Sequence, residues 1–269
     1  VTSKILWKIS VLKNFLRAIK LVGNGESKFF YLNAFHGGLG DWLQFSTLPE
    51  QLYKKFGTKT FVTKDAAFRN EGIKELVMLN PFISGISGDS RDWNLGDIPN
   101  HQSKLDNRDQ NGVKLWERYF DVEPVSECPK VYYTPKIKEE LKDTVLVALS
   151  GVTRFVMSDG MKPIVDDLIE KYTDKKVLMV THSDEIDHKT FDNFHKDGTL
   201  LVKSITDYCD ALASCDVFIS THSGQSHLSS AMKRHNQNME SHCIVEESFL
   251  DIDRKRGTHI YENINYITF

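Results

Sequence analysis

The stretch 215–231, CDVFISTHSGQSHLSSA, shows the pattern from which the fold can be predicted. Val217–Ser220 is a short apolar run that predicts a strand, residues 221–227 are small and polar as in a loop, and Leu228–Arg234 follows helical spacing. The strand does not alternate apolar and polar residues, which is typical of parallel strands covered on both faces. We therefore predict a strand–loop–helix unit of a parallel sheet.

Similar units occur along most of the chain. The stretch Pro124–Pro135 contains three prolines and has no regular period, which predicts a linker. Strands alternating with helices on both sides of this linker predict two α/β domains with parallel sheets. The expected segments are a basic helix at 1–22, an N-terminal domain at 23–123, the linker at 124–143 and a C-terminal domain at 144–269. Expected strands lie at 29–35, 60–63, 145–149 and 177–180, and expected helices at 41–56, 72–79, 114–120, 162–172 and 207–214.

Composition limits the class of protein. The chain has 269 residues, of which 40% are hydrophobic and 26% charged, so it is globular rather than disordered. Its formal charge of −3 argues against sequence-independent binding to the phosphate backbone of nucleic acid, so we expect no nucleic-acid partner. The four cysteines form neither a CxxC pair nor a disulfide framework, and no stretch is apolar enough to span a membrane. We expect reduced thiols and a cytoplasmic protein.

The segment 1–22 has apolar residues at three- and four-residue steps and five Lys or Arg residues without any acid. A basic amphipathic helix of this kind can lie on an anionic membrane surface, which would place the protein at the inner face of the membrane. The alternative is a peripheral helix that packs on the body of the protein. Both interpretations stay open at the level of sequence.

The first candidate for a ligand-binding or catalytic site is the stretch HGGLGD at 36–41, which directly follows an expected strand. Its glycines allow a tight turn and close approach of a ligand, and the helix that follows favours anions at its N-terminus. A dinucleotide motif G-x-G-x-x-G would need glycine where Leu43 stands. Asp41, in the first helical turn, should be ionised and can accept a proton from a substrate hydroxyl. The alternative is that Asp41 only caps its helix.

Two further loops follow expected strands. In the loop 221–227, Gly224 and small neighbours would offer backbone N–H groups to a phosphate, and His227, expected to begin the next helix, could donate to a diphosphate oxygen. The alternative is an ordinary N-cap by Ser223 or Ser226 beside a partly exposed histidine. The loop 150–154 carries hydroxyls and a permanent cation, which also suit phosphate.

A metal site is not expected. His182, His188 and His195 lie near acidic residues, but their spacing does not match a metal-binding HExxH helix, so we interpret them as surface histidines. No carboxylate pair is placed to hold Mg²⁺, and neither a Walker motif nor a G-x-S-x-G elbow occurs.

Taken together, these stretches resemble a known family. GDWLQFSTLP at 40–49 resembles the G-D-x-L-x-x-x-P opening of ADP-heptose:lipopolysaccharide heptosyltransferases, and 215–231 resembles their C-terminal aD-hhhs-DSG-x-xHLaaA signature. Leu79–Ile83 is similar to the family's LNP segment, and Leu149–Gly151 to the loop that opens its nucleotide-binding domain. Order and spacing match from about 29 to 231. His222 stands where the family has Asp.

This resemblance implies a GT-B fold, in which two Rossmann-like domains face each other across a cleft. It implies a metal-independent glycosyltransferase in which the 144–269 domain binds a nucleotide-diphosphate sugar and the 23–123 domain binds a glycan or lipid-linked glycan. Asp41 would be the general base, with inversion at the anomeric carbon and no cofactor. Alternatives are a catalytically silent sugar-nucleotide-binding protein and an epimerase or oxidoreductase on similar domains. The implied substrate-binding residues are Gly38, Gly40, Ser150, Gly151, Thr153, Arg154, Lys162, His222, Ser223, Gly224 and His227.

Overall fold

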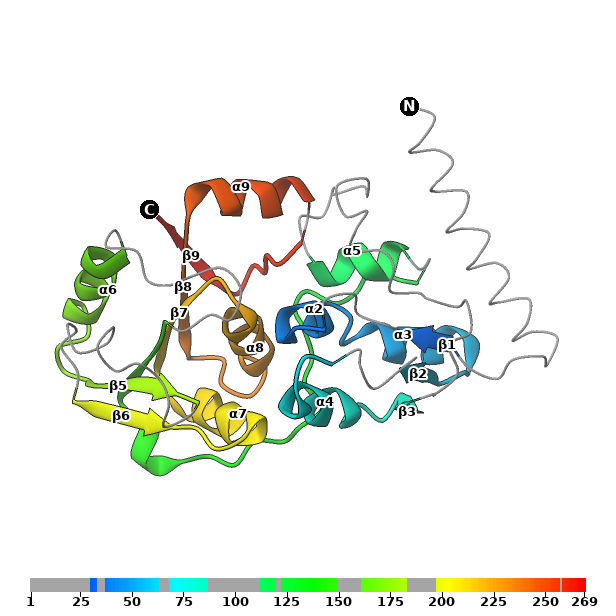
Figure 1. The fold of residues 1–269 in the computed structure, drawn as a ribbon, viewed down its shortest axis with the longest axis horizontal. Coiled ribbons are helices and arrows are strands. Elements are labelled where there is room, and N and C mark those ends of the chain that lie inside the picture. Colours follow the sequence, from blue (N-terminus) through cyan, green and yellow to red (C-terminus); the bar gives the residue numbers. More distant parts are fainter. Residues whose placement is uncertain are drawn as a thin grey trace.

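The computed structural model describes two lobes (Figure 1). The expected basic helix at 1–22 and the loop at 150–154, with Ser150, Gly151, Thr153 and Arg154, lie outside the described residues. His188 and His195 lie outside them as well. The described residues are 30–32, 37–62, 68–86, 112–119, 122–149, 161–182, 197–256 and 258–269.

The N-terminal lobe has a three-stranded parallel sheet, in the order β1-β2-β3. Its strands are β1 (Phe30–Leu32), β2 (Thr60–Val62) and β3 (Ile83–Ile86), and its helices are α2 (Leu39–Gln44), α3 (Leu48–Phe56), α4 (Glu71–Met78) and α5 (Gly112–Tyr119). Large aromatic side chains pack among aliphatic ones in its core. Phe30, Trp42, Phe45 and Trp116 are each at most 2% exposed. Such large rings compensate for the small apolar area that three short strands can bury.

The single helix predicted over 41–56 is wrong, because the structure has two helices here. A turn at 45–47 separates α2 from α3. Pro49 explains the break, since proline has no backbone N–H for an intrahelical bond and its ring clashes with the carbonyl group four residues earlier in a continuous helix. Pro49 is therefore accommodated in the first turn of α3, where that N–H is not needed.

The C-terminal lobe has a six-stranded sheet in the order β6-β5-β4-β7-β8-β9, and every pairing is parallel. This confirms the predicted α/β fold with parallel sheets. The sequence did not predict β6, β8, β9 or α9, because these strands are short or start with polar residues and α9 is highly polar. The elements are β4 (Thr144–Ala148), α6 (Met161–Glu170), β5 (Lys176–Thr181), β6 (Gly198–Leu201), α7 (Ile205–Ser214), β7 (Val217–Thr221), α8 (Gly224–Met232), β8 (Glu240–Val245), α9 (Glu247–Arg256) and β9 (Asn265–Thr268).

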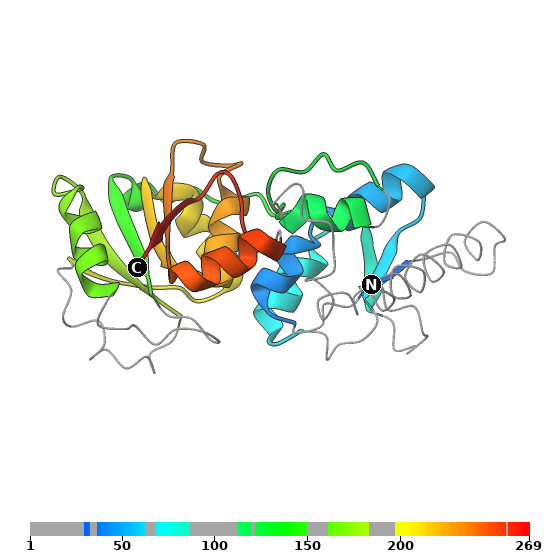
Figure 2. The ribbon, with the colours of Figure 1, turned by 90° about the horizontal axis from the view of Figure 1, so that it is seen from above.

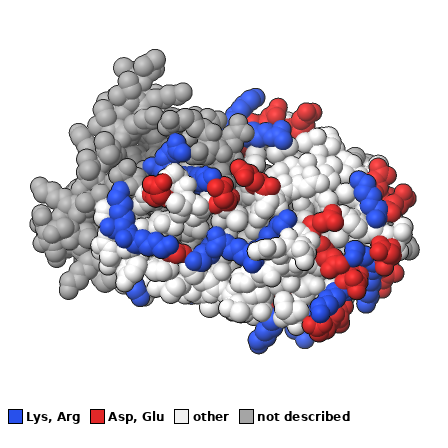
Figure 3. Space-filling model, turned by 180° about the vertical axis from the view of Figure 1, so that it is seen from behind, with Lys and Arg blue, Asp and Glu red and all other residues white. Residues whose placement is uncertain are grey.

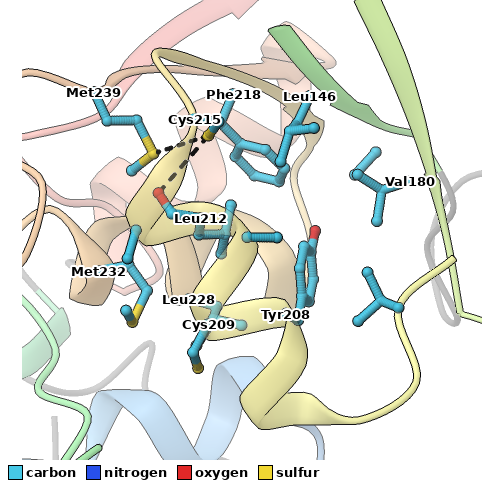
Figure 4. Packing of buried hydrophobic residues seen from close by; sticks show 14 of the residues in the cluster. Leu146, Val180, Tyr208, Cys209, Leu212, Cys215, Phe218, Leu228, Met232 and Met239 are labelled. Atoms are coloured by element: carbon cyan, nitrogen blue, oxygen red, sulfur yellow. Dashed lines mark hydrogen bonds between the residues drawn. The ribbon is translucent and has the colours of Figure 1, made fainter. Parts of the chain in front are cut away.

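Helices cover both faces of this sheet. Leu146 of β4 packs with α7 and α8 on one face, while the neighbouring Val145 and Val147 pack with α6 on the other. Figure 4 shows the first of these cores, in which Leu146 and Phe218 lie against Tyr208 and its neighbours on α7. Burial on both faces explains why these strands are continuously apolar.

The connection between the lobes is bound at both ends. Glu50 of α3 accepts hydrogen bonds from Lys130 Nζ at 2.6 Å and Tyr132 Oη at 2.7 Å. The next residue, Tyr133, donates instead to Asp210 of α7, at 2.9 Å. The chain therefore passes from one lobe to the other between Tyr132 and Tyr133. It runs into a 3-10 turn, η3 (Glu139–Leu141), before β4.

Charged side chains cover the surface in two patterns. Figure 3 shows acids and bases interspersed over the C-terminal lobe and a row of basic side chains on the N-terminal side. Some form ion pairs, such as Lys175 with Asp216 at 2.6 Å. Within the described part of the chain, none of the helices combines the length and the apolar character that a membrane span requires.

Candidate functional site

The two glycine-containing helix starts lie against each other between the lobes, where α2 meets α8 (Figures 1 and 2). A Cβ added to Gly224 would lie 2.8 Å from Leu39 Cβ, and one added to Gly40 would lie 3.1 Å from the ring of His227. Real Cβ atoms do not approach other carbons as closely as 2.8 Å, so position 224 needs glycine, whereas a side chain at position 40 would require the ring of His227 to shift by a few tenths of an ångström. The segments that contain Gly40 and Gly224 therefore touch and do not face each other across an open gap.

A pocket of about 710 Å³ opens beside this contact, within the size range of small-molecule sites. Residues that directly follow β5, β6 and β7 line it, which is where ligands bind in open α/β sheets. Both lobes contribute to the wall. The lining residues are Gly38, Leu39, Gly40, Asp41, Arg69, Asn70, Gly72 and Ile73 from the N-terminal lobe, and His182, Val202, Lys203, Ser204, Ile205, Tyr208, His222, Ser223, Gly224, Gln225, His227 and His259 from the C-terminal lobe.

Asp41 lines the pocket and caps α2. Its Oδ2 accepts a hydrogen bond from the backbone N–H of Gly38 at 3.1 Å, which satisfies a helix-start donor. A Cβ at Gly38 would lie 2.9 Å from this oxygen, so a larger residue there would displace the carboxylate. The cap contact predicted as the structural alternative is thus present. A cap and a pocket-lining carboxylate are compatible roles.

The start of α8 differs from the prediction. The expected loop 221–227 is shorter, because α8 begins at Gly224 and His227 is the fourth residue of the helix rather than its first. Ser223 is the N-cap and accepts from Gln225 N at 3.4 Å. Small polar residues suggested a loop, yet they are the residues that favour the cap and first turn of a helix. His227 is 3% exposed rather than partly exposed.

Both ring nitrogens of His227 have protein partners. Nδ1 lies 2.8 Å from Tyr261 Oη, and Nε2 lies 3.2 Å from His259 Nδ1. The ring nitrogens of His259 in turn lie 3.1 and 3.2 Å from Gln44 Nε2, on α2 of the other lobe. His259 has a backbone φ of 57°, an uncommon conformation for a residue other than glycine. A histidine network therefore joins the lobes next to the pocket.

His222 holds the segment that carries this network. It is 5% exposed, and its Nε2 lies 3.2 Å from the backbone oxygen of His259. Its Nδ1 lies 3.6 Å from Asp253 Oδ2 on α9. His222, which stands where the heptosyltransferase signature has Asp, therefore contacts the segment that follows α9 and also lines the pocket.

The far wall of the pocket is formed by His182 and Tyr208. The rings meet edge to face at 4.9 Å, and His182 Nε2 lies 3.2 Å from Gln225 Nε2. His182 is solvent-exposed, as predicted, yet the pocket wall desolvates the ring and lowers its pKa, so it is neutral at pH 7. Tyr208 is buried, and its hydroxyl has no hydrogen-bond partner among the described residues.

Lys162 is not among the residues that line the pocket. It lies on α6, where its Nζ pairs with Asp166 Oδ2 at 2.5 Å. Sequence reasoning missed Gln44, Asp253, His259 and Tyr261 as parts of the site. No local motif marks them, since only the tertiary fold brings them to His227. Among the described residues, no group of three or more His, Cys, Asp or Glu side chains could hold a metal ion.

The fold defines a class of protein in which two α/β lobes with parallel sheets enclose a site between them. Comparison by sequence finds no matching family model and no matching curated protein. Comparison by structure finds glycosyltransferases, so the chain has the GT-B-like fold of heptosyltransferases, as the sequence resemblance implied.

Three solved structures illustrate the likeness. TibC, the iron-containing dodecameric glycosyltransferase of enterotoxigenic E. coli, is 14% identical with a TM-score of 0.55, over 80% of this chain and 57% of TibC. The family 9 glycosyltransferase of Veillonella parvula is 10% identical with a TM-score of 0.58, over 90% and 85% of the two chains. E. coli heptosyltransferase WaaC with ADP is 12% identical with a TM-score of 0.58, over 90% and 93%. The chain thus spans little more than half the length of TibC.

Proposed function

We propose that this protein is a glycosyltransferase that moves a sugar from a nucleotide-diphosphate sugar to a hydroxyl acceptor. The observation that carries the proposal is the pocket between the lobes, where a carboxylate at the start of α2 and the N-terminus of α8 line one space. The first group suits activation of a hydroxyl and the second suits a diphosphate. The shared fold supports this assignment.

The donor would bind mainly to the C-terminal lobe. The N-terminus of α8, a helix of nine residues, lines the pocket, and its dipole favours negative charge there. His227 adds a side-chain donor one turn into the helix. A solved structure of TibC contains ADP-D-β-D-heptose and one of WaaC contains ADP, so we propose an ADP-sugar as the donor class.

Asp41 would be the general base. In the proposed reaction its carboxylate takes the proton of the acceptor hydroxyl while the hydroxyl oxygen bonds to the anomeric carbon. The bond from this carbon to the diphosphate oxygen breaks on the opposite side, its electron pair leaves with the diphosphate, and the configuration inverts. Donors at the start of α8 would stabilise the departing charge. The loop 150–154 (Ser150, Gly151, Thr153 and Arg154) and Lys162 stay predicted contributors.

Protein donors alone would perform this stabilisation in our proposal, without a metal. Chelation is the direct check, since TibC is described as iron-containing. We expect turnover to survive EDTA and to gain nothing from added Mg²⁺ or Fe²⁺. The acceptor would be a glycan or lipid-linked glycan, and the segment 1–22 would bring the protein to an anionic membrane that carries it.

A ligand screen followed by turnover tests the proposed function. A ligand whose free concentration is a hundred times its dissociation constant stabilises the folded protein by about 2.7 kcal/mol, which a thermal-shift experiment detects readily. We expect ADP and ADP-sugars to raise the melting temperature and adenosine to raise it less. Release of ADP from an ADP-sugar in the presence of a glycan acceptor would then establish the transferase. Binding without release would instead establish a silent sugar-nucleotide-binding protein.

A further inference from the structure

We propose that Tyr261 is a positioning residue that fixes the ring of His227 in the Nε2–H tautomer. The proton of His227 would then point toward the pocket beside Gly40. The tautomer is a property of the protein alone, whereas its use in binding a diphosphate rests on the proposed function.

Tyr261 can serve His227 only as a donor. It is 2% exposed, and burial raises the pKa of its hydroxyl well above the usual range, so the hydroxyl keeps its proton. The Oη lies 2.8 Å from His227 Nδ1, which is its only hydrogen-bonding partner among the described residues. A buried hydroxyl proton without an acceptor is costly, so the O–H donates to Nδ1. Nδ1 therefore carries no proton, and in a neutral imidazole the proton is on Nε2.

The other side of the ring is compatible with the same assignment. His227 Nε2 lies 3.2 Å from His259 Nδ1, so one of these nitrogens donates and the other accepts. Trp116 Nε1 donates to Gln44 Oε1 at 3.4 Å, which turns the amide nitrogen of Gln44 toward His259. This nitrogen has only protons to offer and lies 3.1 Å from His259 Nδ1. It also lies 3.2 Å from His259 Nε2, so it can donate to that nitrogen and leave the lone pair of an unprotonated His259 Nδ1 to accept from His227 Nε2–H, or it can donate to Nδ1 instead.

This arrangement places a donor where α2 packs against α8. A Cβ at Gly40 would lie 3.1 Å from His227 Nε2, so glycine keeps α2 from crowding this atom, and both residues line the pocket. An anionic oxygen accepts a hydrogen bond more strongly than a neutral imidazole does. A phosphate oxygen that enters the pocket would therefore replace His259 Nδ1 as the partner of His227. In the opposite tautomer, Nε2 would present a lone pair to the same anion and repel it.

The tautomer can be read directly in the free protein. We would record ¹⁵N spectra of the histidine rings in the full chain and assign His227 by comparison with His227→Gln. The expected result is a protonated Nε2 and an unprotonated, hydrogen-bonded Nδ1 in the wild type. Tyr261→Phe should remove the hydrogen bond at Nδ1 and yield a mixture of tautomers. Tyr172→Phe is a matched control, because Tyr172 Oη also meets a histidine, His242 Nε2 at 2.9 Å, outside the pocket.

Calorimetry with ADP and adenosine then connects the tautomer to binding. Tyr261→Phe should weaken ADP by about three- to tenfold, the scale of one hydrogen bond, and leave adenosine unchanged, while Tyr172→Phe changes neither. A wild-type ring protonated at Nδ1, or equal losses for both ligands in Tyr261→Phe, would overturn the inference. If Tyr261→Phe does not fold, the wild-type spectrum alone decides. A wild type with the Nε2–H ring that binds no ADP supports the inference and overturns the proposed function.

Discussion

The starts of α2 and α8 are the same kind of structure with opposite chemistry. Each helix start has a glycine where the two helices touch, and each lines the same pocket. At α2 the cap is the carboxylate of Asp41, whereas at α8 it is the hydroxyl of Ser223, followed by a buried histidine. The start of α2 thus contributes a carboxylate and the start of α8 contributes neutral donors. One pocket can therefore contain both a proton acceptor, which comes from the N-terminal lobe, and an anion site, which comes from the C-terminal lobe.

The largest effect should come from removing the charge of Asp41. Asp41→Asn keeps the size and caps a helix almost as well, so the fold should be unchanged. If Asp41 is the general base, the transfer rate should fall by about 10²–10⁴ while the affinity for ADP changes little. Steady-state turnover and calorimetry measure the two quantities separately. A fully active Asp41→Asn would mean that Asp41 only caps α2 and is not the general base.

A smaller effect should follow from changing the α8 side. His227→Ala should weaken ADP by roughly tenfold or more, because a hydrogen bond to a charged group contributes about 1.5–3 kcal/mol. Adenosine, which has no phosphate, should bind as before. Calorimetry with both ligands measures the difference. Equal losses would show that His227 supports the fold of the lobe rather than the anion site.

The contact between the helix starts can be broken sterically. Gly224→Ala places a methyl group 2.8 Å from Leu39 Cβ and should destabilise the protein by about 1–3 kcal/mol. Gly198→Ala is the matched control, because its methyl group would lie 3.5 Å from Leu178 Cδ2, an ordinary contact. Denaturant unfolding of both variants gives the comparison. If Gly224→Ala unfolds like Gly198→Ala, the lobes separate without strain and the close contact is not needed for stability.

The smallest effect concerns Glu50, which binds the linker to the N-terminal lobe through Lys130 and Tyr132. Burial opposes ionisation of Glu50, but bonds from Lys130, Lys54 and Tyr132 outweigh it and lower its pKa from 4.5 to about 2. A carboxyl whose pKa is lower in the folded state stabilises the fold above pH 4.5, and this contribution is lost as the pH falls toward 2. Glu50→Gln should therefore cost about 1 kcal/mol at pH 7 and weaken the loss of stability between pH 4.5 and 2.

A surface ion pair provides the control for this measurement. Glu71 pairs with Lys74 at 3.3 Å, but its side chain is 84% exposed. Glu71→Gln should change the free energy of unfolding by less than about 0.5 kcal/mol at pH 7. Urea unfolding at several pH values compares the two variants. An unchanged pH dependence in Glu50→Gln would show that the linker is held by packing and not by this carboxylate.

The local sequence was sufficient for the elements that carry a strong pattern. Apolar runs such as 145–149 and 217–220 predicted β4 and β7, because strands buried on both faces need apolar residues at every position. Asp41 and Gly224 could be singled out because helix caps and close backbone contacts have residue preferences that are visible locally. The edge strands β6 and β9 escaped prediction, since an edge strand is partly exposed and has a weaker pattern.

The sequence by itself therefore determined a fold of two parallel α/β units and singled out Asp41 and Gly224. Only the tertiary structure decided what surrounds them. Tyr261 and His259 lie more than thirty positions from His227 along the chain, and Gln44 belongs to the other lobe. The proton position on His227 depends on those distant partners, whereas helical and strand periodicity depends only on neighbours in sequence. A hydrogen bond between segments remote in sequence leaves no local pattern, because the spacing of residues around each partner reflects only the helix or strand that contains it.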